Sequence, residues 1–221
     1  MPSTATASEQ PVAQESPEAP APSVPAPSAT AAPEPGSAQL ALEALDSLPV
    51  VDGYADAPYD RARFGETWAD VDRNGCDTRN DILGRDLLDP VFKPGTRDCK
   101  VLSGVLIDPY DGLRTDFVSG FDTSILVQID HVVALAWAWH HGAEHWTDDR
   151  RLAFANDPLN LVAASEATNQ DKSAYGPSEW LPPAAELQCG YMEDWVAVLD
   201  TYDLGINAAD KAAAGAVLAG C

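Results

Sequence analysis

Five polar residues in the second half of the chain have the types and spacing needed for hydrolytic chemistry: Asp130, His131, Asn160, Asn169 and Lys172. The first two end an apolar run, residues 125–129, that reads as a buried strand. The third begins a short apolar run, residues 161–164, and Ser165 follows as the predicted N-cap of a helix. The last two are three residues apart, so they share one face of that helix. Together these residues are able to hold one hard cation beside one general base.

Such a set fits the needs of phosphodiester hydrolysis, which requires an activated water and neutralised phosphate oxygens. We assign His131 as the general base, because an imidazole with an ordinary pKa near 6.5 is neutral at working pH. Asp130 and Asn169 supply oxygen ligands that suit one Mg²⁺ or Mn²⁺ ion. Asn160 braces the loop that aims His131, and we group it with His131 as part of the catalytic apparatus.

Two basic residues are candidates for contact with substrate. Lys172 is expected to touch a flanking phosphate. Arg79 is expected either to reach a phosphate or to pair with an acid of its own helix.

The ordered set Asp130-His131, Asn160, and Asn169 with Lys172 resembles the ββα-metal finger of the HNH endonucleases, which are also described as His-Me finger enzymes. The gap of nine residues between the two asparagines fits that family. The wider chain is similar to secreted actinobacterial HNH proteins of the GmrSD C-terminal type over residues 59–221. Further likeness comes from residues 74–81, 108–112 and 180–182 and from the tail that ends in cysteine. The resemblance implies a nuclease whose products carry 5′-phosphate and 3′-hydroxyl ends.

The elements expected around these residues make an α+β fold. A hairpin of strands over residues 100–107 and 113–118 is predicted to lie beside the strand that ends at His131. Helices are predicted over residues 78–88, 134–146, 191–202 and 208–218, with Leu87 and Leu88 of the first facing inward. A ββα-metal finger spanning about residues 125–175 is therefore expected to pack among helices.

The N-terminal residues differ in composition from the rest. Residues 1–38 are rich in Ala, Pro, Ser and Glu, with almost no large apolar side chains and no Lys or Arg. Such a segment cannot bury enough apolar surface to offset its ordering entropy, so we expect a disordered tail. It is either a spacer near a cell wall or membrane or a passive tail, and residues 39–221 form the nuclease domain.

Four cysteines occur at even count without any CxxC spacing: Cys76, Cys99, Cys189 and Cys221. A zinc ribbon is therefore disfavoured, and disulfides are expected. Three pairings are open, and proximity in sequence favours Cys76 with Cys99 and Cys189 with Cys221. Disulfides indicate an oxidising compartment outside the cytoplasm, and four reduced buried thiols are the alternative.

Export is the localisation that we expect. The first four residues lack the basic region and apolar core of a signal peptide, so we expect that the signal segment is absent from this sequence. No stretch of 18 or more apolar residues is present, so no membrane span is expected.

The charge of the chain is strongly acidic, with 13 Lys and Arg against 35 Asp and Glu and a net charge of −22. This balance disfavours a broad basic nucleic-acid-binding face, although a bound cation supplies positive charge at the scissile phosphate. We therefore predict a secreted, monomeric, divalent-metal-dependent endonuclease of low sequence specificity, acting on DNA or else on RNA.

Two other function classes stay open. One is a non-catalytic acidic binding protein or DNA mimic, which the mixing of basic residues among the acids between Arg61 and Arg114 disfavours. The other is a secreted hydrolase of a different polymer, in which Asp130 and His131 have other roles.

Overall fold

The computed structural model describes residues 36–221. The first helix begins at Ser37, two residues before the expected start of the folded domain, and the tail predicted for the preceding residues lies outside the described part. Among the helices that are described, none is long and apolar enough to cross a membrane.

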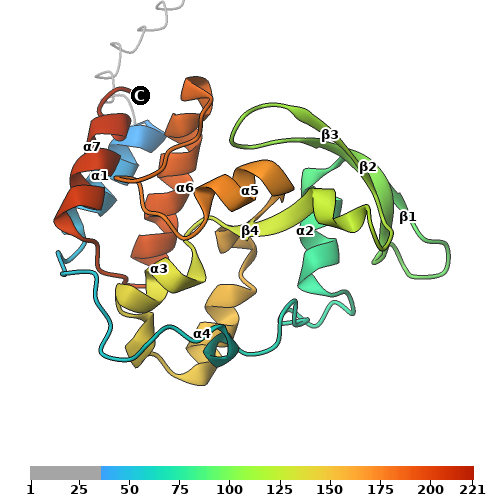
Figure 1. Cartoon of the computed structure of the whole chain (residues 1–221), viewed down its shortest axis with the longest axis horizontal. Helices are drawn as coiled ribbons and strands as arrows, with labels where there is room; N and C mark the ends of the chain where they lie inside the picture. The colour runs from blue at the N-terminus through green and yellow to red at the C-terminus, as the bar shows by residue number, and fades with distance from the viewer. Residues whose placement is uncertain (1–35) are drawn as a thin grey trace, which may run out of the picture. The chain divides into compact units, whose positions relative to one another are not determined.

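The described chain is a mixed α+β fold in which helices outnumber two small antiparallel sheets (Figure 1). The strands are β1 (Leu88–Phe92), β2 (Val101–Ile107), β3 (Arg114–Val118), β4 (Val127–His131) and β5 (Leu161–Ser165). The α-helices are α1 (Ser37–Ser47), α2 (Thr78–Asp86), α3 (Leu135–His140), α4 (Asp148–Ala155), α5 (Glu166–Lys172), α6 (Gln188–Thr201) and α7 (Ala208–Leu218). The short 3₁₀ turns are η1 (Arg61–Phe64), η2 (Ser124–Leu126), η3 (Ala143–His145), η4 (Pro158–Asn160) and η5 (Ala185–Leu187).

Asp130 and His131 end β4, Asn160 ends η4 directly before β5, and Asn169 and Lys172 lie on α5 directly after β5. In the sequence, α3, η3, α4 and η4 lie between β4 and β5. β4 and β5 pair antiparallel, with His131 opposite Leu161. α5 begins directly after β5, and the Ser165 hydroxyl accepts a hydrogen bond from the Thr168 amide, as expected of an N-cap. Asp108 also holds the start of this helix, because its carboxylate accepts hydrogen bonds from the Ser165 amide and the Thr168 hydroxyl. α5 is tied to β4 by the hydrogen bond from Asn169 to Gln128 and by the ion pair of Lys172 with Asp130.

The second sheet differs from the expectation. The hairpin of β2 and β3 forms, but its other neighbour is β1, and β4 pairs with β5 in a separate sheet. β1 takes up Leu88, which we expected to face inward from a longer helix; it is 54% exposed. The helix ends at Asp86 because the chain turns extended at Leu87, the C-cap residue, and Pro90, three residues further on, favours an edge strand.

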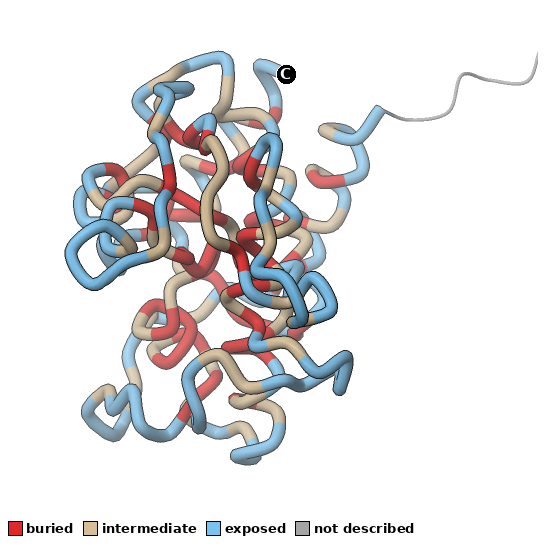
Figure 2. The backbone as a smooth tube through the Cα atoms, turned by 90° about the vertical axis from the view of Figure 1, so that its right-hand side faces the viewer, coloured by how far each residue is buried: buried red, intermediate tan, exposed pale blue. Residues whose placement is uncertain are grey.

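Two apolar cores lie on either side of the β4–β5 pair. The larger is helical and contains buried residues of α1, α3, α4, α6 and α7. The smaller lies between α2, the three-stranded sheet and the strands β4 and β5. Figure 2 shows buried segments running through the interior, with exposed loops around them. β4 contributes Val127 and Ile129 to the smaller core, and Val132 and Val133 directly after it belong to the larger one, so the polar residues at its end sit at the junction between the two cores.

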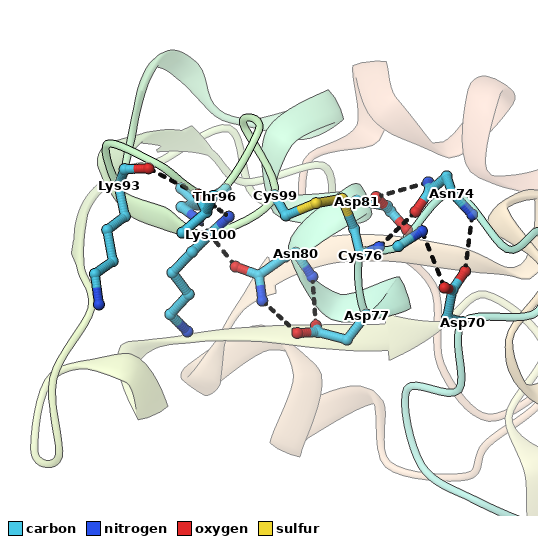
Figure 3. The surroundings of a disulfide bond; sticks show 12 residues. Asp70, Asn74, Cys76, Asp77, Asn80, Asp81, Lys93, Thr96, Cys99 and Lys100 are labelled. Atoms are coloured by element: carbon cyan, nitrogen blue, oxygen red, sulfur yellow. Dashed lines mark hydrogen bonds between the residues drawn. A yellow bond between two sulfur atoms is a disulfide. The ribbon is translucent and has the colours of Figure 1, made fainter.

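Both expected disulfides are present, Cys76–Cys99 and Cys189–Cys221, and residues 36–221 contain no free cysteine. The first ties the loop before α2 to the loop between β1 and β2 (Figure 3). The loop before α2 is also held by side chains, since Asp70 accepts hydrogen bonds from the Asn74 and Gly75 amides. The second disulfide ties the first turn of α6 to the C-terminal residue.

Reduction is expected to lower stability substantially. The bridges close loops with sequence separations of 23 and 32 residues, and the chain-entropy relation gives about 3–4 kcal/mol for loops of this size. Thermal melts with and without reductant, with thiol titration of the native protein, measure this effect. Four reactive thiols in the untreated native protein would contradict it.

Candidate functional site

A cleft of about 510 Å³ opens where β4 ends. Asp130 and His131 line it from the strand, and Asn169 lines it from α5. Three of the five residues singled out by type and spacing therefore share one solvent-facing hollow. The other two, Asn160 and Lys172, are fully buried behind it.

The His131 ring is held in one orientation. Its Nε2 lies 2.9 Å from the main-chain oxygen of Ala155, and only 7% of the residue is exposed. A carbonyl oxygen only accepts hydrogen bonds, so we assign the proton of the neutral ring to Nε2. Nδ1 is then the unprotonated nitrogen, and it has no hydrogen-bond partner among residues 36–221. The Trp68 ring lies nearly parallel to the imidazole, with 6.2 Å between ring centroids and 14° between planes.

Burial lowers the pKa of His131 to about 4, an effect that the hydrogen bond to Ala155 and the Asp130 charge oppose and the Arg61 and Lys172 charges reinforce. The ring is therefore neutral at pH 7, as a general base must be.

This lowered pKa also predicts a pH dependence of stability. Between its ordinary pKa near 6.5 and the folded value of about 4, His131 binds a proton in the unfolded chain but not in the folded one. Its contribution, about 3 kcal/mol, is present above pH 6.5 and is lost as the pH falls toward 4. Urea unfolding in EDTA at pH 7 and pH 4.5 should show a smaller loss for His131→Gln than for the parent. Equal losses would contradict the buried, neutral state.

Asp130 has two partners, Tyr110 and Lys172, and the sequence did not predict that both contact its carboxylate. Its Oδ2 accepts a hydrogen bond from the Tyr110 hydroxyl at 2.6 Å and lies 2.9 Å from Lys172 Nζ. The Lys172 ammonium also donates to the main-chain oxygen of His131 at 2.8 Å. Lys172 is 0% exposed, so in this structure it positions Asp130 and His131 and does not reach toward a flanking phosphate.

Asn169 is oriented by a neighbour on β4. Its Nδ2 donates to Gln128 Oε1 at 2.7 Å, which leaves Oδ1 as the free end of the amide. Within the described residues, neither this oxygen nor Oδ1 of Asp130 takes part in a hydrogen bond. Two oxygens of different elements are thus available in one cleft.

These oxygens fit a hard divalent cation in type, since Mg²⁺ and Mn²⁺ prefer oxygen ligands. The protein offers few ligands for such a cation. Residues 36–221 hold no group of three or more His, Cys, Asp or Glu side chains arranged for a metal, and Lys172 already neutralises much of the Asp130 charge. A cation here would depend on the Asn169 amide, water and substrate oxygens to complete its shell.

Asn160 spans the turn that follows β4. Its Oδ1 accepts a hydrogen bond from the Val133 amide at 2.8 Å, and its Nδ2 donates to the Val133 carbonyl at 3.3 Å. Its own carbonyl accepts from the Val132 amide. Asn160 does not line the cleft, so it acts on the chemistry through the backbone next to His131.

Arg79 and four residues not singled out from the sequence complete the site. Arg79 lines the cleft and donates to the main-chain oxygens of Ser124 and Val127, so it bridges the start of β4 to α2. The residues missed are Tyr110, Gln128, Arg61 and Trp68. Tyr110 was visible only as part of a turn, and Gln128 only as one residue of an apolar strand.

A family model describes most of the chain that builds this site. Residues 77–213 match the C-terminal domain of the GmrSD restriction endonucleases. The match covers more than half of the 221 residues and contains the whole β4–β5–α5 unit. The chain belongs to the GmrSD C-terminal domain family.

A curated relative is similar over nearly the full length of both chains. It is named an uncharacterized secreted protein of Arthroderma benhamiae, and it is 36% identical over 200 residues, which is 87% of this chain and 93% of the relative. No solved structure matches the chain significantly.

Proposed function

We propose that this protein is a secreted endonuclease that hydrolyses phosphodiester bonds with a divalent cation and His131 as general base. The observation that carries the proposal is the shared cleft: it is lined by His131, whose tautomer is set by Ala155, and by Asp130 and Asn169, each of which has one side-chain oxygen without a hydrogen bond in the described residues. Membership of a family named for restriction endonucleases supports the reaction class. The secreted relative and the two disulfides support export.

In this proposal each residue has one task. His131 Nδ1 takes a proton from the attacking water, because Nε2 keeps its own proton in the hydrogen bond to Ala155. Asp130 and Asn169 hold the cation through their free oxygens. When bound, the cation neutralises phosphate oxygens and polarises the bond under attack. Asn160, Tyr110 and Lys172 keep the base and the carboxylate in place.

Nucleic acid, with DNA first and RNA second, is the substrate that this cleft suits. Its lining holds two arginines and a single carboxylate, Asp130. Because Lys172 pairs with that carboxylate, the cleft is locally cationic in a chain of net charge −22. This local reversal of sign favours a nuclease over an acidic DNA mimic, which would present carboxylates here. We propose that the protein acts as a monomer.

The test is nicking of supercoiled plasmid DNA by the parent and by His131→Ala protein purified in parallel. The parent is expected to nick in Mg²⁺ or Mn²⁺, to stop when EDTA is added, and to resume when excess metal is restored. A matched assay on single-stranded RNA ranks the two substrates. Equal behaviour of parent and variant, or cleavage that ignores EDTA, would refute the proposal.

A further inference from the structure

Arg61 is the exposed arginine of the cleft. Within residues 36–221, no carboxylate lies within ion-pair distance of it. Arg63, Arg114 and Arg150 each have a carboxylate partner, whereas Arg73 and Arg97 are exposed without one among the described residues, but neither of these two lines the cleft. Of the two arginines that line the cleft, Arg61 is thus the one with neither a carboxylate nor a main-chain oxygen as a partner in the described part of the chain.

Arg61 also lies next to the candidate base. It lines the cleft that contains His131, and the two residues also line a smaller hollow together with Trp68. Its charge acts on the imidazole, since it is one of the groups that depress the pKa of His131. The other arginine of the cleft, Arg79, has its Nη2 committed to two carbonyl groups.

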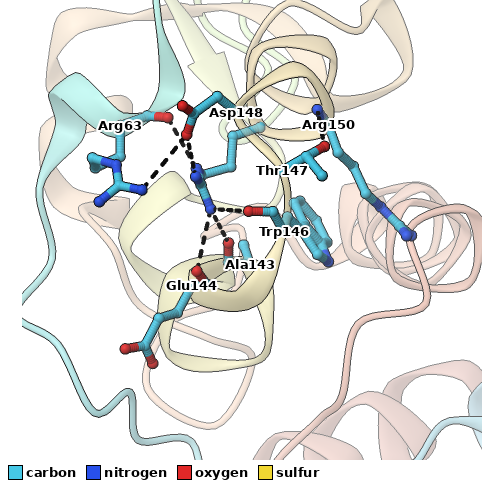
Figure 4. A network of polar contacts seen from close by, with 8 residues as sticks. Arg63, Ala143, Glu144, Trp146, Thr147, Asp148 and Arg150 are labelled. Carbon is cyan, nitrogen blue, oxygen red and sulfur yellow. Dashed lines mark hydrogen bonds and ion pairs between the residues drawn. The ribbon is translucent and has the colours of Figure 1, made fainter.

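The backbone that carries Arg61 is firmly held, although its side chain forms no ion pair with a carboxylate of residues 36–221. Asp60 caps the η1 turn by accepting from the Ala62 amide. Phe64 at its end is buried and lies 6.3 Å from the Phe154 ring, centroid to centroid. The buried guanidinium of Arg151 donates to the Arg63 carbonyl at 3.0 Å, in the polar network around Arg63, Trp146 and Asp148 (Figure 4). A guanidinium without a carboxylate partner, carried by a firmly held backbone turn, is well placed to bind an anion.

We propose that Arg61 binds a non-bridging oxygen of the substrate phosphate next to His131. A guanidinium offers two parallel N–H donors to a phosphate, and the bond strengthens as charge builds up on the oxygens under attack. Trp68, with a left-handed backbone at φ 61° and its ring alongside the imidazole, walls this phosphate position. The inference rests on the proposed function, because it names the residue that holds the substrate of that site.

The test compares Arg61→Ala and Arg61→Gln with Arg63→Ala. Arg63 is on the same turn, is paired with Asp148, and does not line the cleft, so it is the matched control. Binding of a fluorescent single-stranded DNA oligonucleotide is measured in EDTA over a range of salt concentrations, and cleavage is measured in Mg²⁺. Circular dichroism checks that each variant is folded, and Arg61→Gln retains most of the side-chain volume if alanine perturbs the turn.

Each Arg61 variant is expected to weaken binding at low salt and to reduce the slope of log affinity against log salt by about 1. It should also lower kcat by about 10²-fold or more, the size seen when one transition-state donor is removed. Arg63→Ala should keep the parental slope and kcat.

The outcomes separate the two proposals. If the parent cleaves and the Arg61 and Arg63 variants have the same salt slope and the same kcat, the inference about Arg61 is overturned and the proposed function is not. If the parent shows no metal-dependent cleavage, but the Arg61 variants still bind DNA with a salt slope smaller by about one unit, the proposed function is overturned. Arg61 is then supported as the phosphate-binding residue. A parent that binds no oligonucleotide overturns the inference.

Discussion

Replacing His131 by alanine should lower the rate of phosphodiester cleavage by about 10²–10⁴-fold, the range associated with a lost general base. The reason is specific to the ring: Nδ1 is the unprotonated nitrogen in the cleft because the Ala155 carbonyl holds the proton on Nε2. Turnover of a plasmid or oligonucleotide at saturating metal measures the effect. His145→Ala is the matched control, because this exposed histidine lies outside the cleft.

The variant must be folded for the result to count. His131 is buried, so His131→Gln, which retains more volume, should be assayed beside the alanine variant. Parental turnover by both variants would remove His131 from the mechanism. A loss of turnover by His145→Ala as large as that of His131→Ala would indicate that the chemistry is elsewhere.

Breaking the ion pair behind the cleft should have the largest effect on stability. Lys172→Met leaves the carboxylate of Asp130, only 5% exposed, with the Tyr110 hydroxyl as the one partner on Oδ2 that remains within residues 36–221. Removing one partner of a buried pair costs about 3–5 kcal/mol, because the other charge stays desolvated. Urea unfolding measures the loss, and Lys93→Met, at an exposed position, should change stability by less than about 0.5 kcal/mol.

The double variant Asp130→Asn with Lys172→Met distinguishes a lost pair from a lost side chain. It removes both charges, so it should be less destabilised than the sum of the two single variants. Additive losses, or a Lys172→Met protein as stable as the parent, would contradict the positioning role of Lys172.

The local parts of this structure follow from sequence patterns. Ser165, Thr147 and Asn207 accept the N-cap hydrogen bonds of α5, α4 and α7, and the first and last of these helices begin where predicted. Caps are local, because the side chain bonds an amide only two or three residues away. The elements β4, β5 and α5 were predictable for the same reason, since each strand carries its own apolar run and α5 follows its own N-cap residue, Ser165.

The partners within the site were less predictable, because they depend on how elements pack. Lys172 ends a helix and reads as a surface residue, and its burial follows from a carboxylate that β4 presents 42 residues earlier. Tyr110 belongs to a turn, and only the fold brings its hydroxyl to Asp130. Arg61 lies about 70 residues before His131 and reaches the cleft because Arg151 and Phe64 hold its turn against α4.

The sheet arrangement was mispredicted for a related reason. The alternation of apolar and polar residues in β2 and β3 predicts the hairpin but does not predict which strand pairs with its free edge. In the structure that strand is β1. β4 is then free to pair with β5, which joins the Asp130–His131 end to α5.

The most direct test of the account measures metal affinity and cleavage rate on the same preparations of parent, His131→Ala and Asn169→Ala. Titration calorimetry with Mn²⁺, with substrate present in excess, gives the affinity, and plasmid nicking gives the rate. His131→Ala should keep the parental affinity but lose cleavage, whereas Asn169→Ala should weaken both because it removes an oxygen ligand. Loss of metal affinity in His131→Ala would make His131 a ligand, and parental cleavage by both variants would place the activity outside this cleft.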